Sequence, residues 1–242
     1  MNLRLLAPVA LSLQLACIHA DASFHFMQIE QIVGGIQGDP SAQAIQLRMR
    51  SGGQNIVSAS RLRAFDAAGL NPVLLLNIGS NVSSGTAGAN VLLTTAAFNT
   101  RMSAVPGFAT DFTLTNAIPA SYLNGGKVTF EDDNGGVLWA VAFGNYTGTN
   151  TGLTDNDANG DFGAPFASPL PTATAQGIRF TGTASALSTT NSADYAFTPD
   201  PAVVRNNAGN SFSVVPEPGS TALLALGALG LTGMRRRKEG SR

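Results

Sequence analysis

The sequence predicts a mainly β protein whose central part folds as an antiparallel β-sandwich. Three observations indicate this fold class. Short apolar segments recur along the chain, each bounded by Gly, Asn, Ser or Pro residues that favour turns. One of them, residues 42–50, alternates between apolar and polar side chains, as a half-buried strand does. Only residues 96–102 have a helical pattern in this central part, and no repeat of fixed period indicates a propeller or solenoid.

The predicted strands begin at residue 24. Residues 24–33 are apolar and end at a turn that contains Gly, Asp and Pro. In the next strand, residues 42–50, the side chains of Ile45, Leu47 and Met49 face inward because successive side chains of a strand point to opposite faces. Further strands are expected at residues 61–66, 73–78, 90–94 and 111–114.

The clearest hairpin joins residues 127–132 to residues 137–143. The connecting residues 133–136 read Asp-Asn-Gly-Gly, and Asn-Gly tolerates the positive φ angles of tight hairpin turns. Trp139, the only tryptophan, lies in the second strand of this hairpin. We expect it to pack in the core, and a ligand-stacking platform is the alternative.

Both ends of the chain carry targeting features. Residues 1–22 resemble a signal peptide, with a basic start, an apolar stretch over residues 5–18, and small residues at Ala20 and Ala22 that form a cleavage site. The mature chain is therefore expected to start at Ser23. At the other end an apolar run over residues 219–234 lies between two short motifs. The first motif is Val215, Pro216, Glu217 and Pro218, and the second is the basic cluster Arg235, Arg236, Arg237 and Lys238.

The apolar run predicts a single hydrophobic helix that crosses a membrane only marginally. At about 1.5 Å per residue, residues 219–234 span about 24 Å, which is shorter than the hydrocarbon core of about 30 Å. Three glycines weaken this helix further. Basic residues beside a membrane segment stay cytoplasmic, so the basic cluster places the tail inside and the central part of the chain outside. The segment therefore fits a transient processing handle.

The order of these tail motifs resembles the PEP-CTERM sorting signal. The resemblance implies an exported bacterial protein that signal peptidase and an exosortase process. It further implies a transient stay at the inner membrane, followed by the cell surface or the extracellular matrix, with exopolysaccharide as a candidate partner. The expected organisation is a signal peptide at residues 1–22, a β-sandwich domain at residues 23–213 and a sorting tail at residues 214–242.

The composition of the central domain excludes several classes of function. It contains no cysteine, and His25 is its only histidine, so thiol chemistry and multi-histidine metal sites are excluded. Eight cations and twelve acidic residues give a net charge of 8 − 12 = −4, and no basic stripe predicts a nucleic-acid partner. Two arginine pairs at a spacing of two residues are expected on solvent-exposed strand faces: Arg48 with Arg50, and Arg61 with Arg63.

A second resemblance concerns the central domain. Its segments look like those of bacterial lamin-tail-like domains, which implies an immunoglobulin-like sandwich and supplies no catalytic residues. The segments that carry the resemblance are residues 44–49, 62–69, 90–95, the run Gly-Gly-Lys-Val-Thr-Phe-Glu-Asp from Gly125, and Arg-Asn-Asn-Ala-Gly at residues 205–209.

One loop is a candidate calcium site. The side chains of Asp155, Asp157, Asn159 and Asp161 alternate along the loop, as in the first half of an EF-hand loop. The second half is missing, because Phe166 stands where a bidentate Glu would close the coordination shell. Calcium binding would need carboxylates or carbonyls from elsewhere to complete the shell, and the turn at residues 131–133 is a candidate source. The alternative is a solvated loop without metal, and no other cofactor is expected.

These features together predict a structural or adhesive envelope protein that is not an enzyme. A secreted calcium- or carbohydrate-binding module is the first alternative. A hydrolase that acts on polysaccharides is the second, although the only glutamates of the domain, Glu30 and Glu131, are not marked as an acid–base pair. Residues 191–213 are expected to form a last strand and then a loose stalk that leaves the sorting motif accessible.

Overall fold

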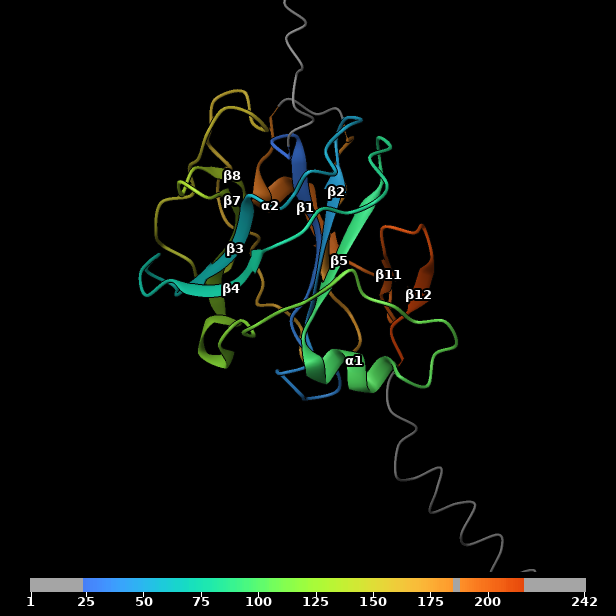
Figure 1. Ribbon diagram of the computed structural model, residues 1–242. Helices are drawn as coiled ribbons and strands as arrows, with labels where there is room; N and C mark the ends of the chain where they lie inside the picture. Colours follow the sequence, from blue (N-terminus) through green and yellow to red (C-terminus); the bar gives the residue numbers. More distant parts are fainter. Residues whose placement is uncertain (1–23, 185–187, 216–242) are drawn as a thin grey trace, which may run out of the picture.

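A computed structural model describes residues 24–184 and 188–215 and confirms a mainly β fold (Figure 1). The strands are β1 (Met27–Val33), β2 (Ala44–Met49), β3 (Ser60–Phe65), β4 (Val73–Ile78), β5 (Asn90–Thr94), β6 (Phe112–Thr113), β7 (Gly125–Asp132), β8 (Val137–Gly144), β9 (Ile178–Phe180), β10 (Tyr195–Phe197), β11 (Val203–Arg205) and β12 (Ser211–Ser213). The helices are α1 (Ala96–Met102), α2 (Asn191–Asp194) and the single 3₁₀ turn η1 (Ala120–Tyr122).

The strands form three sheets. A six-stranded sheet has the order β10-β9-β1-β2-β5-β6, a four-stranded sheet has the order β4-β3-β7-β8, and β11 pairs with β12 alone. The pairings are antiparallel, as predicted, except that β5 and β6 run parallel through Leu93–Phe112 and Thr94–Thr113. Strand β9 pairs with β1 although the two lie far apart in the sequence, so the late part of the chain completes the larger sheet.

The main core lies between the six-stranded and the four-stranded sheets. Ile45, Leu47 and Met49 of β2 are fully buried in it, as the alternating pattern predicts, but Gln46 is also buried, so the prediction of a half-buried strand is wrong at that position. Trp139 of β8 is also fully buried, and its Nε1 donates a hydrogen bond to the Tyr195 hydroxyl at 2.8 Å. Since this ring has no exposed face, the core interpretation of Trp139 is confirmed and the ligand platform is wrong.

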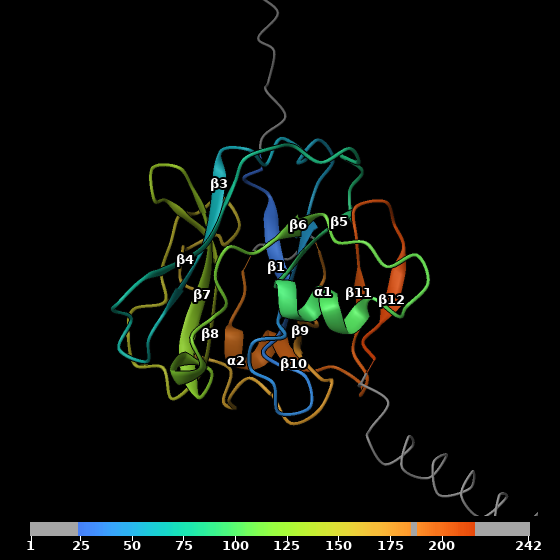
Figure 2. The ribbon, with the colours of Figure 1, turned by 60° about the horizontal axis from the view of Figure 1, so that its bottom comes forward.

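A second, smaller core covers the opposite face of the six-stranded sheet. Helix α1 and the β11–β12 hairpin lie against this face beside β5 (Figures 1 and 2). Thr95 caps α1 by accepting a hydrogen bond from the Phe98 amide at 3.2 Å, which satisfies one of the unpaired N–H groups at a helix start. Phe98 then packs with Phe212 and Val204 of the hairpin in the same apolar cluster. The six-stranded sheet is therefore covered on both faces at this end.

The loose stalk predicted for the end of the domain is wrong. Strands β11 and β12 pair in register, and Val204, Phe212 and Val214 are buried. The Val214 amide donates to the Ala202 carbonyl at 2.8 Å. Val204 lies opposite Phe212 across the hairpin and Val214 lies two residues after Phe212, so the three side chains share one face, which the second core buries. The chain is therefore packed up to the residue before Val215.

The arginine face of β3, predicted to be solvent-exposed, is only partly exposed and is engaged in ion pairs. Arg61 and Arg63 both pair with Glu131 of β7, at 3.0 Å from Arg61 Nε to Oε2 and 2.7 Å from Arg63 Nη2 to Oε2. The Glu131 side chain has no exposed surface, whereas the two arginine side chains are 24% and 27% exposed. A buried carboxylate needs charged partners, so β3 supplies both arginines across the ladder.

The two predicted targeting segments lie outside the described residues, as do Ala20, Ala22, the residues 216–218 of the sorting motif and the basic cluster at residues 235–238. Among residues 24–184 and 188–215, no helix is both long and apolar enough to span a bilayer.

Candidate functional site

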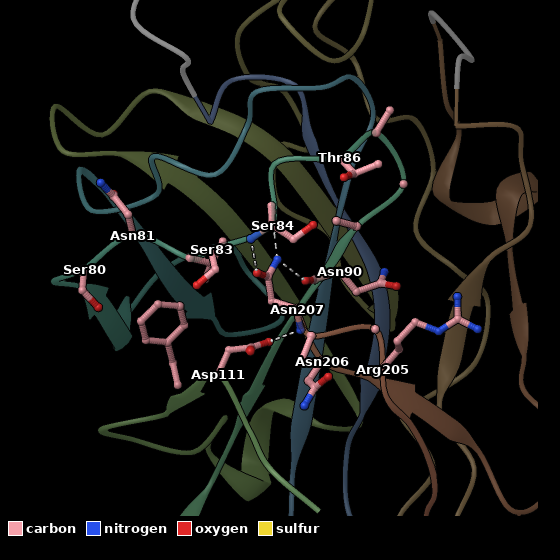
Figure 3. Close-up of a pocket in the computed structure, with 17 residues that line it drawn as sticks. Ser80, Asn81, Ser83, Ser84, Thr86, Asn90, Asp111, Arg205, Asn206 and Asn207 are labelled. Atoms are coloured by element: carbon pink, nitrogen blue, oxygen red, sulfur yellow. Dashed lines mark hydrogen bonds between the residues drawn. The ribbon is translucent and has the colours of Figure 1, made fainter.

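A pocket lies where three connecting segments meet at the edge of the six-stranded sheet. Its volume is about 680 Å³, which falls within the range of about 300–1,000 Å³ common to small-molecule sites. The loop between β4 and β5, the start of β6 and the β11–β12 turn form its walls (Figure 3). Hydroxyl and amide side chains dominate the lining; they include Ser80, Asn81, Ser83, Ser84, Thr86 and Asn90. We call it the amide–hydroxyl pocket.

Asn207 of the β11–β12 turn holds two of these walls together. Its Oδ1 accepts from the Ser84 amide at 2.7 Å, and its Nδ2 donates to the Ser84 carbonyl at 3.1 Å and to the Asn90 carbonyl at 3.0 Å (Figure 3). The side chain is only 7% exposed. The side-chain amide of Asn207 therefore satisfies both the backbone N–H and the backbone carbonyl of Ser84, as the backbone of a neighbouring strand would. It thereby fixes the β4–β5 loop on the hairpin.

Asp111 joins the third wall to the β11–β12 turn and to strand β5. Its Oδ2 accepts hydrogen bonds from the backbone N–H of Leu92 at 2.7 Å and from the backbone N–H of Asn207 at 2.8 Å. Burial raises the pKa of this carboxyl above its usual range, and the two amide donors act in the opposite direction. Asp111 thus accepts two backbone N–H groups at the base of the pocket, which makes its role structural.

A smaller pocket of about 150 Å³ adjoins the first and shares Gly88, Asn90 and Arg205 with it. Its centre is Glu30, which is 3% exposed. Glu30 is the extra residue of a β-bulge, because Ile29 pairs with Leu47 and Gln31 with Gln46 while Glu30 has no cross-strand partner. Bulges redirect a side chain and occur next to binding sites. We call this the Glu30 pocket.

Both oxygens of Glu30 are held by hydrogen bonds. Oε2 accepts from Gln46 Nε2 at 2.7 Å and from Asn90 Nδ2 at 2.5 Å. Oε1 accepts from Arg179 Nη2 at 2.9 Å, and Arg48 Nη1 lies 3.9 Å from the same oxygen. Three strands supply these partners: β2, β5 and β9 surround Glu30, which lies on β1. The sheet order therefore creates the cluster.

Three arginines line the Glu30 pocket around this single carboxylate. They are Arg48, Arg179 and Arg205, so the charges of the lining residues sum to 3 − 1 = +2. The Arg205 amide donates to Gln46 Oε1, and its Nε donates to Ser211 Oγ at 3.0 Å. The pocket is thus cationic on a domain whose net charge is −4. It also corrects the expectation for Arg48, which lies beside Glu30 with its side chain 31% exposed.

The structure places the predicted calcium ligands in a chain of local turns. Asp157 is fully buried, and its Oδ2 accepts from the Thr189 amide at 2.7 Å. The Oδ1 atoms of Asp157, Asn159 and Asp161 each accept the amide two residues further on, at 2.8–3.2 Å. Asp155 Oδ2 lies 2.5 Å from His25 Nδ1.

No group of three or more His, Cys, Asp or Glu side chains is arranged to hold a metal ion within residues 24–184 and 188–215. Glu131, from the turn that is a candidate source of further calcium ligands, is paired with two arginines instead. The calcium site at residues 155–161 stays a prediction.

The sequence indicated neither the amide–hydroxyl pocket nor the Glu30 pocket as a site. Their residues come from distant segments: Glu30 and Arg205, for example, lie 205 − 30 = 175 positions apart. One local signal was present: Glu30 interrupts a strand in which every residue is buried. A charged residue at the centre of such a strand indicates a buried polar partner.

The comparison with protein families concerns the tail. The model of the PEP-CTERM protein-sorting motif matches residues 214–238, and a search of curated proteins found no match for the chain. The match begins at Val214, the buried residue bonded to Ala202, so the folded domain and the motif adjoin directly. The chain therefore carries a PEP-CTERM protein-sorting motif, the signal of an exported protein that is held at the membrane and sorted by an exosortase.

Proposed function

We propose that this is an envelope or extracellular-matrix protein whose domain at residues 23–213 is a structural or adhesive module without catalytic activity. Signal peptidase and an exosortase process it, and its final location is the cell surface or the matrix. The PEP-CTERM match at residues 214–238 carries the proposal, because the motif concerns export and sorting. We further propose that the two packed sheets are an immunoglobulin-like sandwich.

The geometry of the acidic residues supports a non-catalytic role. General acid–base catalysis needs a carboxyl group within reach of a substrate proton. Glu30 and Asp111 instead accept hydrogen bonds from neighbouring side chains and amides, and Glu131 is closed off by two arginines. Each of these carboxylates stabilises the contact between strands or loops in the described part of the chain.

The amide–hydroxyl pocket supports carbohydrate binding as the second candidate function. Amide and hydroxyl groups both donate and accept hydrogen bonds, as sugar hydroxyls require. Phe112 adds an apolar surface to the same lining. A module that adheres to matrix polysaccharide through this pocket is compatible with the first proposal. The hydrolase alternative receives no support from this pocket, which has Asp111 as its only carboxylate.

Sorting is tested in a host that encodes an exosortase. We expect deletion of residues 216–218, or replacement of Arg235, Arg236, Arg237 and Lys238 by Gln, to leave the chain unprocessed in the membrane fraction. Arg242→Gln is the matched control, since it removes a terminal cation beyond the matched residues. Normal processing and surface display of both altered tails would refute the sorting proposal.

The adhesive role is tested by fractionating the culture and by assaying the exported protein for polysaccharide cleavage. The exported protein should co-purify with the extracellular matrix and release no reducing sugar from it. Polysaccharide cleavage that is lost on substitution of one aspartate would instead establish the hydrolase. A protein found only in the soluble medium would refute the adhesive role while leaving the sorting proposal intact.

A further inference from the structure

We propose that the Glu30 pocket binds the acidic groups of an anionic polysaccharide, with Arg48 and Arg205 as the residues that contact the carboxylate or sulfate of the sugar. The inference deepens the carbohydrate-binding function proposed above and rests on it. It adds the chemical class of the ligand and the residues that select that class.

The first argument is the number of donors. Each guanidinium carries five N–H donors in a fixed fork that matches a carboxylate or sulfate. Within the described residues, the Arg48 side chain makes no hydrogen bond and only a 3.9 Å ion pair with Glu30. Arg205 uses only its Nε, toward Ser211. Most donors of these two side chains therefore remain available to a ligand at a pocket wall.

The second argument is that Glu30 does not neutralise the arginines. Its two oxygens already accept from Gln46, Asn90 and Arg179, and its single charge leaves the lining residues at +2. The buried Glu131 pairs directly with two arginines, whereas Arg179 is the one arginine within hydrogen-bond distance of Glu30 among the described residues. Two further guanidinium groups around the same pocket indicate that a second anion is accommodated.

The third argument is that the pocket is preorganised. Gln46 bonds Glu30 through Nε2 and accepts the Arg205 backbone amide through Oε1. It thereby fixes β11, which carries Arg205, relative to β2, which carries Arg48. Glu30, Gln46 and Asn90 are each less than 5% exposed and are hydrogen-bonded to one another, so the frame behind the arginines is held in place. Frames held in this way reduce the entropy lost on binding.

The fourth argument identifies the rest of the ligand. The Glu30 pocket adjoins the amide–hydroxyl pocket, and the two share Gly88, Asn90 and Arg205 in their walls. Figure 3 shows Arg205 extending beside Asn90 and Asn206 at the edge of the larger pocket. A cationic pocket that adjoins one lined by amides and hydroxyls fits an acidic sugar next to neutral sugar hydroxyls. A small inorganic anion would use the Glu30 pocket alone.

The test compares an acidic polymer with its neutral form. The full-length chain in detergent is titrated with polygalacturonate and with the same polymer after carboxyl reduction. We expect the acidic polymer to bind at least about tenfold more tightly, and this preference to fall at high salt. Arg48→Gln should remove about tenfold of the affinity for the acidic polymer and leave the weak binding of the neutral polymer unchanged, because Arg48 lines only the Glu30 pocket. Arg205→Gln, which alters both pockets, should also remove about tenfold of the affinity for the acidic polymer.

The control is Arg61→Gln, which makes the same change in net charge on the four-stranded sheet. It should bind the acidic polymer as the unaltered chain does, and thermal melts should show that all variants are folded. Equal binding of both polymers, unaffected by Arg48→Gln and Arg205→Gln, would overturn the anion site and leave carbohydrate binding standing. Binding of neither polymer would overturn the site together with that function, whereas the sorting test is independent of both. Competition by millimolar sulfate alone, with no polymer binding, would overturn the polysaccharide as the ligand.

Discussion

Replacement of Asn207 by Ala is expected to loosen the β11–β12 hairpin from the sheet. The substitution removes the three side-chain hydrogen bonds to Ser84 and Asn90. At about 1 kcal/mol net for each bond, the free energy of unfolding should fall by about 3 kcal/mol. Because Ser84 is half-buried, water can replace part of what it loses, and the expected range is about 2–3 kcal/mol.

This prediction is measured by urea unfolding of the purified chain. The urea concentration at the unfolding midpoint should fall. The slope of the free energy of unfolding against urea concentration should stay the same, because the surface exposed on unfolding is unchanged. For a domain of this size, the melting temperature should drop by about 5–10 °C. Asn210→Ala is the matched control: Asn210 lies in the same turn, is exposed, and makes no side-chain hydrogen bond within the described residues. Equal losses for Asn207→Ala and Asn210→Ala would refute the proposed role of Asn207.

Three further outcomes follow from the structure. Burial raises the pKa of Tyr146 to about 12, so the contribution of this hydroxyl to stability is complete below about pH 10 and is lost as the pH rises toward 12. Between these pH values the free energy of unfolding should fall more steeply with pH in the unaltered chain than in Tyr146→Phe, by the equivalent of up to one proton. Glu131→Gln leaves two arginines without their buried carboxylate and should lower the free energy of unfolding by about 3 kcal/mol in urea melts; an unchanged midpoint would contradict this. If the loop at residues 155–161 binds calcium, millimolar calcium should raise the melting temperature and Asp157→Asn should abolish the rise; the absence of any rise removes the site.

Much of the fold could be predicted from the sequence because β-strands leave a local pattern. The alternation of Ile45, Leu47 and Met49 corresponds to their burial in β2, and the helical pattern of residues 96–102 agrees with α1. Residues 178–213 were predicted poorly. Their strands contain only three residues each, which is too short for a periodic signal, and pairing with β1 rather than local pattern stabilises β9.

The environment of the charged residues could not be predicted in the same way. A spacing of two places Arg61 and Arg63 on one face of a strand, but it does not reveal that Glu131 is buried between them. Likewise, nothing local distinguishes Asn207 from Asn210, although only the first has its side chain buried against the β4–β5 loop. Burial of a polar side chain depends on which other segment arrives beside it.

The sequence by itself determined the sorting route, because the PEP-CTERM motif is linear: its proline–glutamate pair, apolar run and basic cluster act through their order and spacing within residues 214–238. It also determined the mainly β class, since alternation along a strand is a local property. Only the tertiary structure decided where a ligand could bind. Glu30, Arg48, Arg179 and Arg205 meet because the sheet order β9-β1-β2-β5 and the docked β11–β12 hairpin bring distant segments together. That convergence depends on long-range pairing and on the bulge at Glu30, and neither leaves a periodic trace in the sequence.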